Sequence, residues 1–164
     1  MKVSLKMINA IRTGGGKPAP LPIYVGDDAV SYADDWTYTY TIVELANPLN
    51  LTGLLTTLKT YTELGLTAVK IGMFYQVGDS THLTCRGYVT LSSIATHYSE
   101  NAISLAGVAG DLLGFYYTAG AFCSQLTGGP GMLYLSGDHF NANNTNFSLA
   151  SGRRLSANAV GLAS

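Results

Sequence analysis

The chain has 164 residues and a net charge of −1, with 47% hydrophobic but only 12% charged residues. The nine lysines and arginines are scattered, which excludes the basic surface of a nucleic-acid-binding protein, and no apolar run is long enough to span a bilayer. The length favours one domain with a sizeable core, and the scarcity of charge favours a subunit that covers part of its surface with neighbours.

Residues 1–22 are predicted to form an extended N-terminal arm. The stretch SLKMINAI suits a short strand that folds back on the domain or docks on a neighbour, and TGGGKPAPLP is typical of a hinge. The residues expected to anchor the arm are Leu5, Met7, Ile8 and Ile11. The hinge glycines are Gly14, Gly15 and Gly16. The arm has no apolar stretch typical of a signal peptide, so we expect no export by that route.

The stretch WTYTYTIVEL, residues 36–45, alternates large apolar side chains with threonines and is predicted to be one strand. Trp36, Tyr38 and Tyr40 fall on the same face of this strand. We interpret the aromatic face as a wall of the core or of a contact between subunits. A platform on which sugar rings stack is the alternative.

The next segments contain one ambiguous stretch and one clear hairpin. Residues 54–64 (LLTTLKTYTEL) combine leucines that suit a helix with threonines that suit a strand, so we expect a strand or a loop with one helical turn. Strands at 68–77 and 81–91 flank the compact turn GDS. The side chains of the second strand expected to point inwards are Leu83, Cys85 and Tyr88.

Further short strands are predicted at residues 101–107, 111–120 and 132–138, between turns rich in Gly, Asn and Asp. Such closely spaced strands, with hardly any helical period, are typical of a β-sandwich. We therefore predict an all-β protein, a jelly-roll-like antiparallel β-sandwich over residues 23–164 with the extended arm in front of it.

No catalytic constellation emerges, so we expect a non-enzymatic protein without a cofactor. Asp138-His139 is the one place where an acid and a base are adjacent, and we interpret it as a turn in which Asp138 caps its own backbone. A calcium ion held by loop oxygens is the weaker alternative, with the acidic pairs 27–28 and 34–35 and the turn residues Asp79, Asp111 and Asp138 as candidate ligands.

The remaining reactive and basic side chains are expected to be structural. Cys85 and Cys123 belong to separate predicted strands, and without a signal for export we expect free buried thiols. The adjacent Arg153 and Arg154 are expected at a solvated strand end, and His97 in a polar loop.

Five short motifs follow one another between residues 45 and 140. They are Asn47-Pro48, Phe74 before the small hairpin, Cys85-Arg86, Gly110-Asp111 and Ser136-Gly137-Asp138. In this order they resemble β-sandwich structural proteins of tailed phages and environmental viral sequences. The resemblance implies a virion structural protein rather than a mechanism, and the N-terminal arm and the stretch VAGDLLG depart from the pattern.

From the resemblance and the composition we expect a capsid decoration or head-fibre subunit on the virion surface, made in the host cytoplasm. The arm would bind the major capsid protein or another virion protein. The sandwich faces would self-associate into a homo-oligomer, with a trimer as the first guess. The alternatives are a glycan-binding module of a tail fibre or receptor-binding protein, which contacts host-surface glycans, and a self-assembling extracellular filament subunit. Neither nucleic acid nor a membrane is an expected partner.

Overall fold

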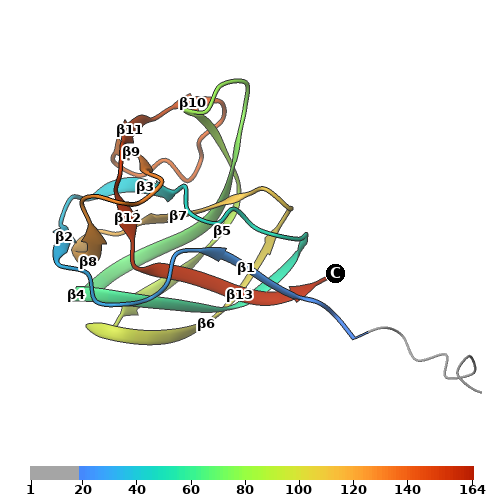
Figure 1. Cartoon of the computed structure of the whole chain (residues 1–164), viewed down its shortest axis with the longest axis horizontal. Helices are drawn as coiled ribbons and strands as arrows, with labels where there is room; N and C mark the ends of the chain where they lie inside the picture. Colours follow the sequence, from blue (N-terminus) through green and yellow to red (C-terminus); the bar gives the residue numbers. More distant parts are fainter. Residues whose placement is uncertain (1–18) are drawn as a thin grey trace, which may run out of the picture.

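The structure is a computed structural model that describes residues 19–164. The part described is built from antiparallel β-strands joined by turns and loops (Figure 1). It contains no helix that is long and apolar enough to cross a membrane. The predicted arm and hinge residues Leu5, Met7, Ile8, Ile11, Gly14, Gly15 and Gly16 lie outside the described residues.

The all-β, antiparallel class predicted from the sequence is confirmed, because every pairing between two strands in residues 19–164 is antiparallel. The jelly-roll connectivity stays a prediction. The strands are β1 (Pro22–Gly26), β2 (Asp34–Trp36), β3 (Tyr40–Glu44), β4 (Gly53–Gln76), β5 (His82–Ile94), β6 (His97–Gly107), β7 (Leu112–Tyr116), β8 (Ala119–Gln125), β9 (Met132–Ser136), β10 (Thr145–Asn146), β11 (Ser148–Ala150), β12 (Arg154–Leu155) and β13 (Ala157–Ala163).

The fold is organised around β4, a strand of 24 residues. Along one edge of β4, β5 pairs with its second half and β6 with its first half. β5 and β6 follow each other in the chain, and together with β4 they form one long antiparallel ribbon. The other edge carries β13, β8 and β7 in succession. β1 extends the sheet beyond β13, while β3, β9 and β11 extend it beyond β7.

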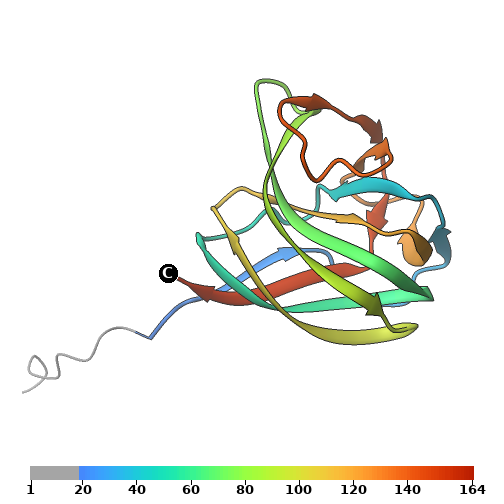
Figure 2. The ribbon, with the colours of Figure 1, turned by 180° about the vertical axis from the view of Figure 1, so that it is seen from behind.

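This ribbon folds back on itself near its middle, so that its two halves become the two layers of a sandwich (Figures 1 and 2). At the bend Ala68 has φ of 49° and His97 has φ of 65°, both in the left-handed region. The Gly65 N–H donates to Thr96 Oγ1 at 3.1 Å across the ribbon. β6 begins at His97, so this residue does not lie in the predicted polar loop.

The main core lies between the two layers. Leu55 and Leu58 from the first half of β4 belong to the same buried cluster as Val69, Ile71 and Met73 from its second half. Burying a side chain of this size contributes about 1.5–3 kcal/mol. The apolar side chains that β4 directs inwards thus hold the ribbon in its folded-back shape.

A second, smaller core lies on the opposite face of the layer that contains the second half of β4. Phe74 and Leu83 pack there against Phe140 and Phe147 from the loop and turns at 137–147. The Cys85 N–H donates to the Ala142 carbonyl at 3.1 Å and fixes that loop on β5. Leu83 and Cys85 do point inwards as expected, with Cys85 half-buried, but the expectation for Tyr88 is wrong because its side chain is 43% exposed.

Two other details correct the sequence prediction. Residues 36–45 are not one strand, since β2 ends at Trp36 and β3 begins at Tyr40. The break occurs where the chain leaves β8, the partner of β2, for β7 and β9, the partners of β3. The ambiguous residues 54–64 are strand throughout, with β13 and then β8 paired along one edge of β4 and β6 along the other edge as far as Thr62.

The motifs behind the viral resemblance have structural tasks. Arg86 forms two hydrogen bonds with the buried Asp111, Nε to Oδ2 at 2.6 Å and Nη2 to Oδ1 at 3.0 Å. The Leu49 N–H, just after Asn47-Pro48, donates to the Asp111 carbonyl at 2.8 Å. Three separated motifs thus meet at one corner, where a two-pronged ion pair fixes the turn between β6 and β7.

Candidate functional site: an aromatic pocket

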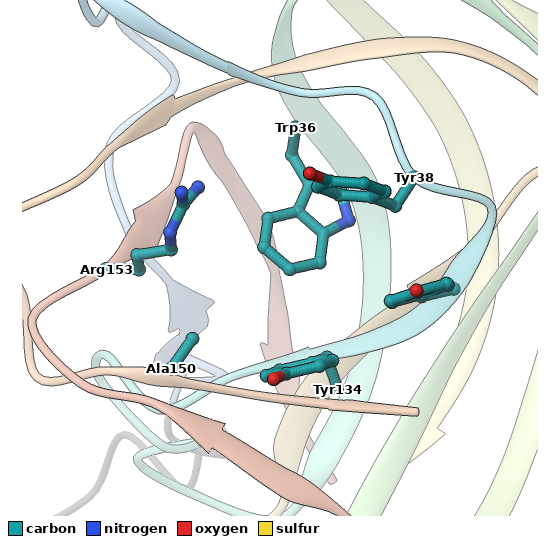
Figure 3. A pocket seen from close by; sticks show the side chains of 6 residues that line it. Trp36, Tyr38, Tyr134, Ala150 and Arg153 are labelled. Carbon is teal, nitrogen blue, oxygen red and sulfur yellow. The ribbon is translucent and has the colours of Figure 1, made fainter. Parts of the chain in front are cut away.

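A pocket of about 330 Å³ opens beside the strand pair β3–β9, at one end of the main core. Figure 3 shows Arg153 on one side of the Trp36 indole and Tyr38 on the other. The residues that line the pocket are Trp36, Tyr38, Tyr40, Tyr134, Ala150 and Arg153. The volume is within the range of small-molecule sites.

Trp36 forms the inner wall of the pocket. β2 pairs with β8 and sets Trp36 opposite Phe122, and the buried Tyr117 hydroxyl donates to the Trp36 carbonyl at 2.7 Å. The indole is only 4% exposed, yet its Nε1–H is buried without a hydrogen-bond partner among the described residues. A buried donor in this state favours a water or a ligand acceptor nearby.

Three tyrosines form a stack next to the indole. The rings of Tyr38 and Tyr40 are 5.4 Å apart at 25°, and those of Tyr40 and Tyr134 are 5.9 Å apart at 9°. The β3–β9 register makes Tyr40 and Tyr134 diagonal neighbours. Tyr38 follows the end of β2 and is 55% exposed, so the outer end of the stack is open to solvent.

Arg153 faces the indole from the turn between β11 and β12. Gly152, with φ of 76°, makes that turn, and the Gly131 N–H donates to the Arg153 carbonyl at 3.0 Å. The guanidinium carbon lies 5.1 Å from the centre of the Trp36 ring. This is the geometry of a cation–π contact.

The pocket is suited to binding rather than to proton transfer. The described residues that line it include no carboxylate, imidazole or thiol. It offers instead aromatic faces for stacking, tyrosine hydroxyls for hydrogen bonds and one cation. Rings with an apolar face and polar edges fit such a surface, because the face stacks on aromatic rings while the edges need hydrogen bonds.

The structure brings the three predicted aromatic residues together, with different exposures. Trp36 belongs to the core, Tyr40 is half-buried and Tyr38 is exposed. Tyr134 and Arg153 were missed as members of the site, since each is more than 90 residues away from Trp36 in the chain. The adjacent Arg153 and Arg154 were expected at a solvated strand end, and no local sequence pattern places Arg153 over the indole.

The Asp138-His139 pair lies elsewhere and forms the expected turn. Asp138 Oδ1 accepts the Phe140 N–H at 3.1 Å, and its other oxygen pairs with Lys70. His139 Nε2 lies 2.8 Å from the Ser136 carbonyl. Both side chains are thus occupied by structural contacts within the turn.

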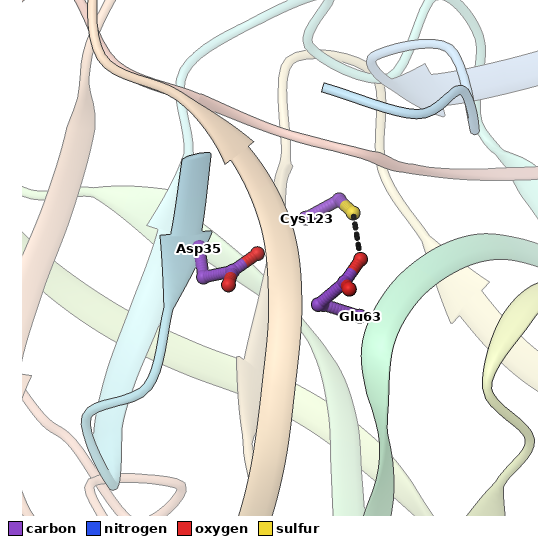
Figure 4. A group of neighbouring side chains, drawn as sticks. All are labelled: Asp35, Glu63 and Cys123. Atoms are coloured by element: carbon purple, nitrogen blue, oxygen red, sulfur yellow. Dashed lines mark hydrogen bonds between the residues drawn. The ribbon is translucent and has the colours of Figure 1, made fainter. Parts of the chain in front are cut away.

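One group of three possible metal-ligating side chains lies outside the pocket (Figure 4). Asp35, Glu63 and Cys123 hold their ligand atoms within 4.8 Å of one another, with both carboxylates exposed. Partial loss of hydration, then the Glu63 charge, raises the pKa of the exposed Asp35, and burial raises the pKa of the Cys123 thiol. A protonated thiol is a poor metal ligand, so this group is a weak candidate for a cation site.

Both cysteines are free, as expected, but only Cys123 is fully buried. The acidic pair at 34–35 lies in β2, and in the pair at 27–28 Asp27 binds Arg154 at 3.2 Å. That carboxylate therefore already has a cation from the chain itself.

No protein-family model matches the chain, and a comparison with curated proteins also finds no match. The function is therefore inferred from the fold and from the chemistry of the aromatic pocket.

Proposed function

We propose that the protein is a non-enzymatic carbohydrate-binding module, and that the aromatic pocket is its sugar site. The observation that carries this proposal is the stack of Tyr38, Tyr40 and Tyr134 beside Trp36. The stack ends at the exposed ring of Tyr38. The apolar face of a sugar ring stacks on an aromatic ring, and its hydroxyls find partners in phenol groups at the rim.

The outer ring of the stack is accessible to a ligand. Tyr38 is 55% exposed, so its phenol ring can be contacted from solvent. The tyrosine hydroxyls of the stack make no hydrogen bond to the described residues, so they are available to a ligand. We propose a host-surface glycan as the target, as expected for the glycan-binding alternative.

A glycan array probed with the full chain tests the proposal. We expect binding to a limited set of glycans, and a loss of at least about tenfold in affinity for Tyr38→Ala, because the open stacking face disappears. Tyr24→Ala is the matched control, since Tyr24 is 51% exposed on β1 and lies outside the pocket. Absence of binding to any glycan, or an equal loss in both variants, contradicts the proposal.

A second proposal, a self-associating virion subunit, is favoured by an exposed apolar surface where β1, β13 and β4 come together. Leu54 and Leu162 are paired neighbours there, 43% and 51% exposed, and Leu21 continues the surface. Within residues 19–164, β6 pairs only with β4, so its outer edge has no partner among them. Open edges and exposed leucines are typical of surfaces that contact another copy.

Light scattering on the full chain tests the second proposal. We expect a closed oligomer, which Leu54→Glu converts to smaller species because a charge replaces an interface leucine. Leu149→Glu is the control, since Leu149 is 51% exposed on β11, away from this surface. A monomeric full chain contradicts self-association and leaves the sugar proposal standing.

A further inference from the structure

The guanidinium of Arg153 is a cation without a counter-charge in the described chain. It forms no ion pair and no side-chain hydrogen bond with residues 19–164, and its Nη1 is buried without a partner. Residues 1–18 contain no Asp or Glu, so they offer no side-chain carboxylate either. An uncompensated charge next to a binding pocket calls for an explanation, because unpaired buried donors cost stability.

The neighbouring Arg154 shows that the local backbone does not force this state. Arg154 pairs with Asp27 at 3.2 Å and donates to the Gly128 carbonyl. The two successive arginines, one before β12 and one at its start, thus differ: Arg154 has a carboxylate partner although its Nε is unpaired, and Arg153 has none among the described residues. Arg154 fastens the turn to the sandwich, while Arg153 is directed to the Trp36 side of the turn and keeps its donors for something else.

We infer that the sugar bound in the aromatic pocket carries an anionic group, a carboxylate or a sulfate, and that Arg153 binds this group. The inference rests on the proposed sugar site. The sugar ring would stack on the tyrosines while the anion lies toward Arg153 across the indole (Figure 3). A guanidinium presents parallel N–H donors that match two oxygens of one anion, and such charge-assisted bonds are stronger than neutral ones.

The chain provides its own reporter for the test, since Trp36 is its only tryptophan and lines the pocket. Titrations of the full chain with galactose, galacturonic acid and galactose 6-sulfate, and with lactose and sialyllactose, are followed by Trp36 fluorescence. We expect each acidic sugar to bind at least about tenfold tighter than its neutral partner. Higher salt is expected to weaken the acidic sugars selectively.

Arg153→Gln is expected to bring acidic and neutral sugars to about equal affinity while neutral binding persists. Arg153→Lys keeps the charge but loses the two-pronged geometry, so its preference for acidic sugars is expected to lie between those of the original chain and Arg153→Gln. Lys59→Gln removes one positive charge on the outer face of β4 and should leave the preference intact. An unchanged unfolding midpoint in Arg153→Gln shows that the fold is preserved.

The outcomes separate the inference from the proposal beneath it. Neutral sugars that bind as tightly as acidic ones, or a preference that survives Arg153→Gln, overturn the anionic group but leave the sugar site. Preference for only the carboxylates or only the sulfate supports the inference and identifies the anion. If none of these sugars and no glycan on the array binds, both the inference and the proposed function fail.

Discussion

Glu44 is a buried carboxylate that joins β3 to the chain around it. Its Oε1 accepts the Ala46 N–H at 2.9 Å, and its Oε2 accepts the Leu155 N–H of β12. Burial, which disfavours the charged form, raises the pKa of Glu44 to about 7, and the two backbone N–H groups only partly offset this effect. A group of this kind titrates near neutral pH, so the free energy of unfolding depends on pH.

We predict that the free energy of unfolding falls as the pH rises from 5 to 8. Because the pKa of Glu44 is higher in the folded protein than in the unfolded chain, the folded state holds the extra proton, and its advantage is lost as the pH passes 7. The expected fall is about 2–3 kcal/mol by denaturant titration.

Two variants test whether the dependence of the free energy of unfolding on pH comes from Glu44. Glu44→Gln should flatten the dependence on pH, whereas Glu100→Gln should not, because Glu100 is half-exposed and its pKa is lowered. A slope that survives Glu44→Gln assigns the effect to another group.

Among the elements, β4 is most constrained where it changes partners. Between Thr67, which pairs with Ala119 of β8, and Lys70, which pairs with Tyr116 of β7, the backbone passes through Ala68 with φ of 49°. This conformation is unfavourable for a residue with a Cβ and worst for a β-branched one. The bend of the ribbon is therefore set at a position that any larger side chain disturbs.

We predict that Ala68→Val lowers the free energy of unfolding by about 1–2 kcal/mol, while Ala68→Gly does not lower it. Ala68 is exposed, so the loss is a backbone effect rather than a packing effect. Thr67→Val, a β-branched substitution one residue away at an exposed strand position, is the control and should be nearly neutral. Equal losses at the two positions would rule out backbone conformation as the cause.

The sequence predicts those elements whose signals are local. The hairpin around GDS was predictable because Gly78, with φ of 75°, makes the turn between two alternating strands. Cys123 was placed on a strand, but the bounds of β8 were not predicted, because residues 121–124 are all buried and a strand buried on both faces has no period of two. The folding back of β4 arises from its several partners, which no short stretch encodes.

In the candidate site too, only the residues with a local sequence signal could be predicted. Trp36, Tyr38 and Tyr40 were predicted to share a face because they alternate within one short stretch. Tyr134 joins them through the pairing of β3 with β9, and Arg153 through hydrogen bonds between two turns. These contacts depend on tertiary structure, so the cation of the site could not be found from spacing.

For the whole molecule, the hairpin formed by β4 and β5 provides the edges on which other strands assemble. Its turn is closed by Asp79, whose Oδ1 accepts the N–H groups of Thr81 and His82 at 2.9 and 3.0 Å. Most other pairings join distant segments, which is typical of slow-folding β proteins. We therefore expect this local turn to form early in folding.

We predict that Asp79→Ala slows refolding by about fivefold and changes the unfolding rate little, as expected for a residue of the folding nucleus. Asp34→Ala is the control. It removes a similar contact to the Leu126 N–H at the periphery and should mainly speed unfolding. Stopped-flow refolding and unfolding measure both rates, and an Asp79 variant that only unfolds faster contradicts an early hairpin.

The smaller core under the 137–147 segment makes Cys85 a natural chemical probe. Its thiol is half-buried at the edge of that core, and the covering segment is held by contacts such as the Cys85 N–H to Ala142 carbonyl bond and the Lys70–Asp138 ion pair. Cys123 is fully buried in β8. A thiol reagent should thus modify Cys85 whenever the cover lifts and Cys123 only when the sandwich itself opens, so one labelling experiment times the two motions separately.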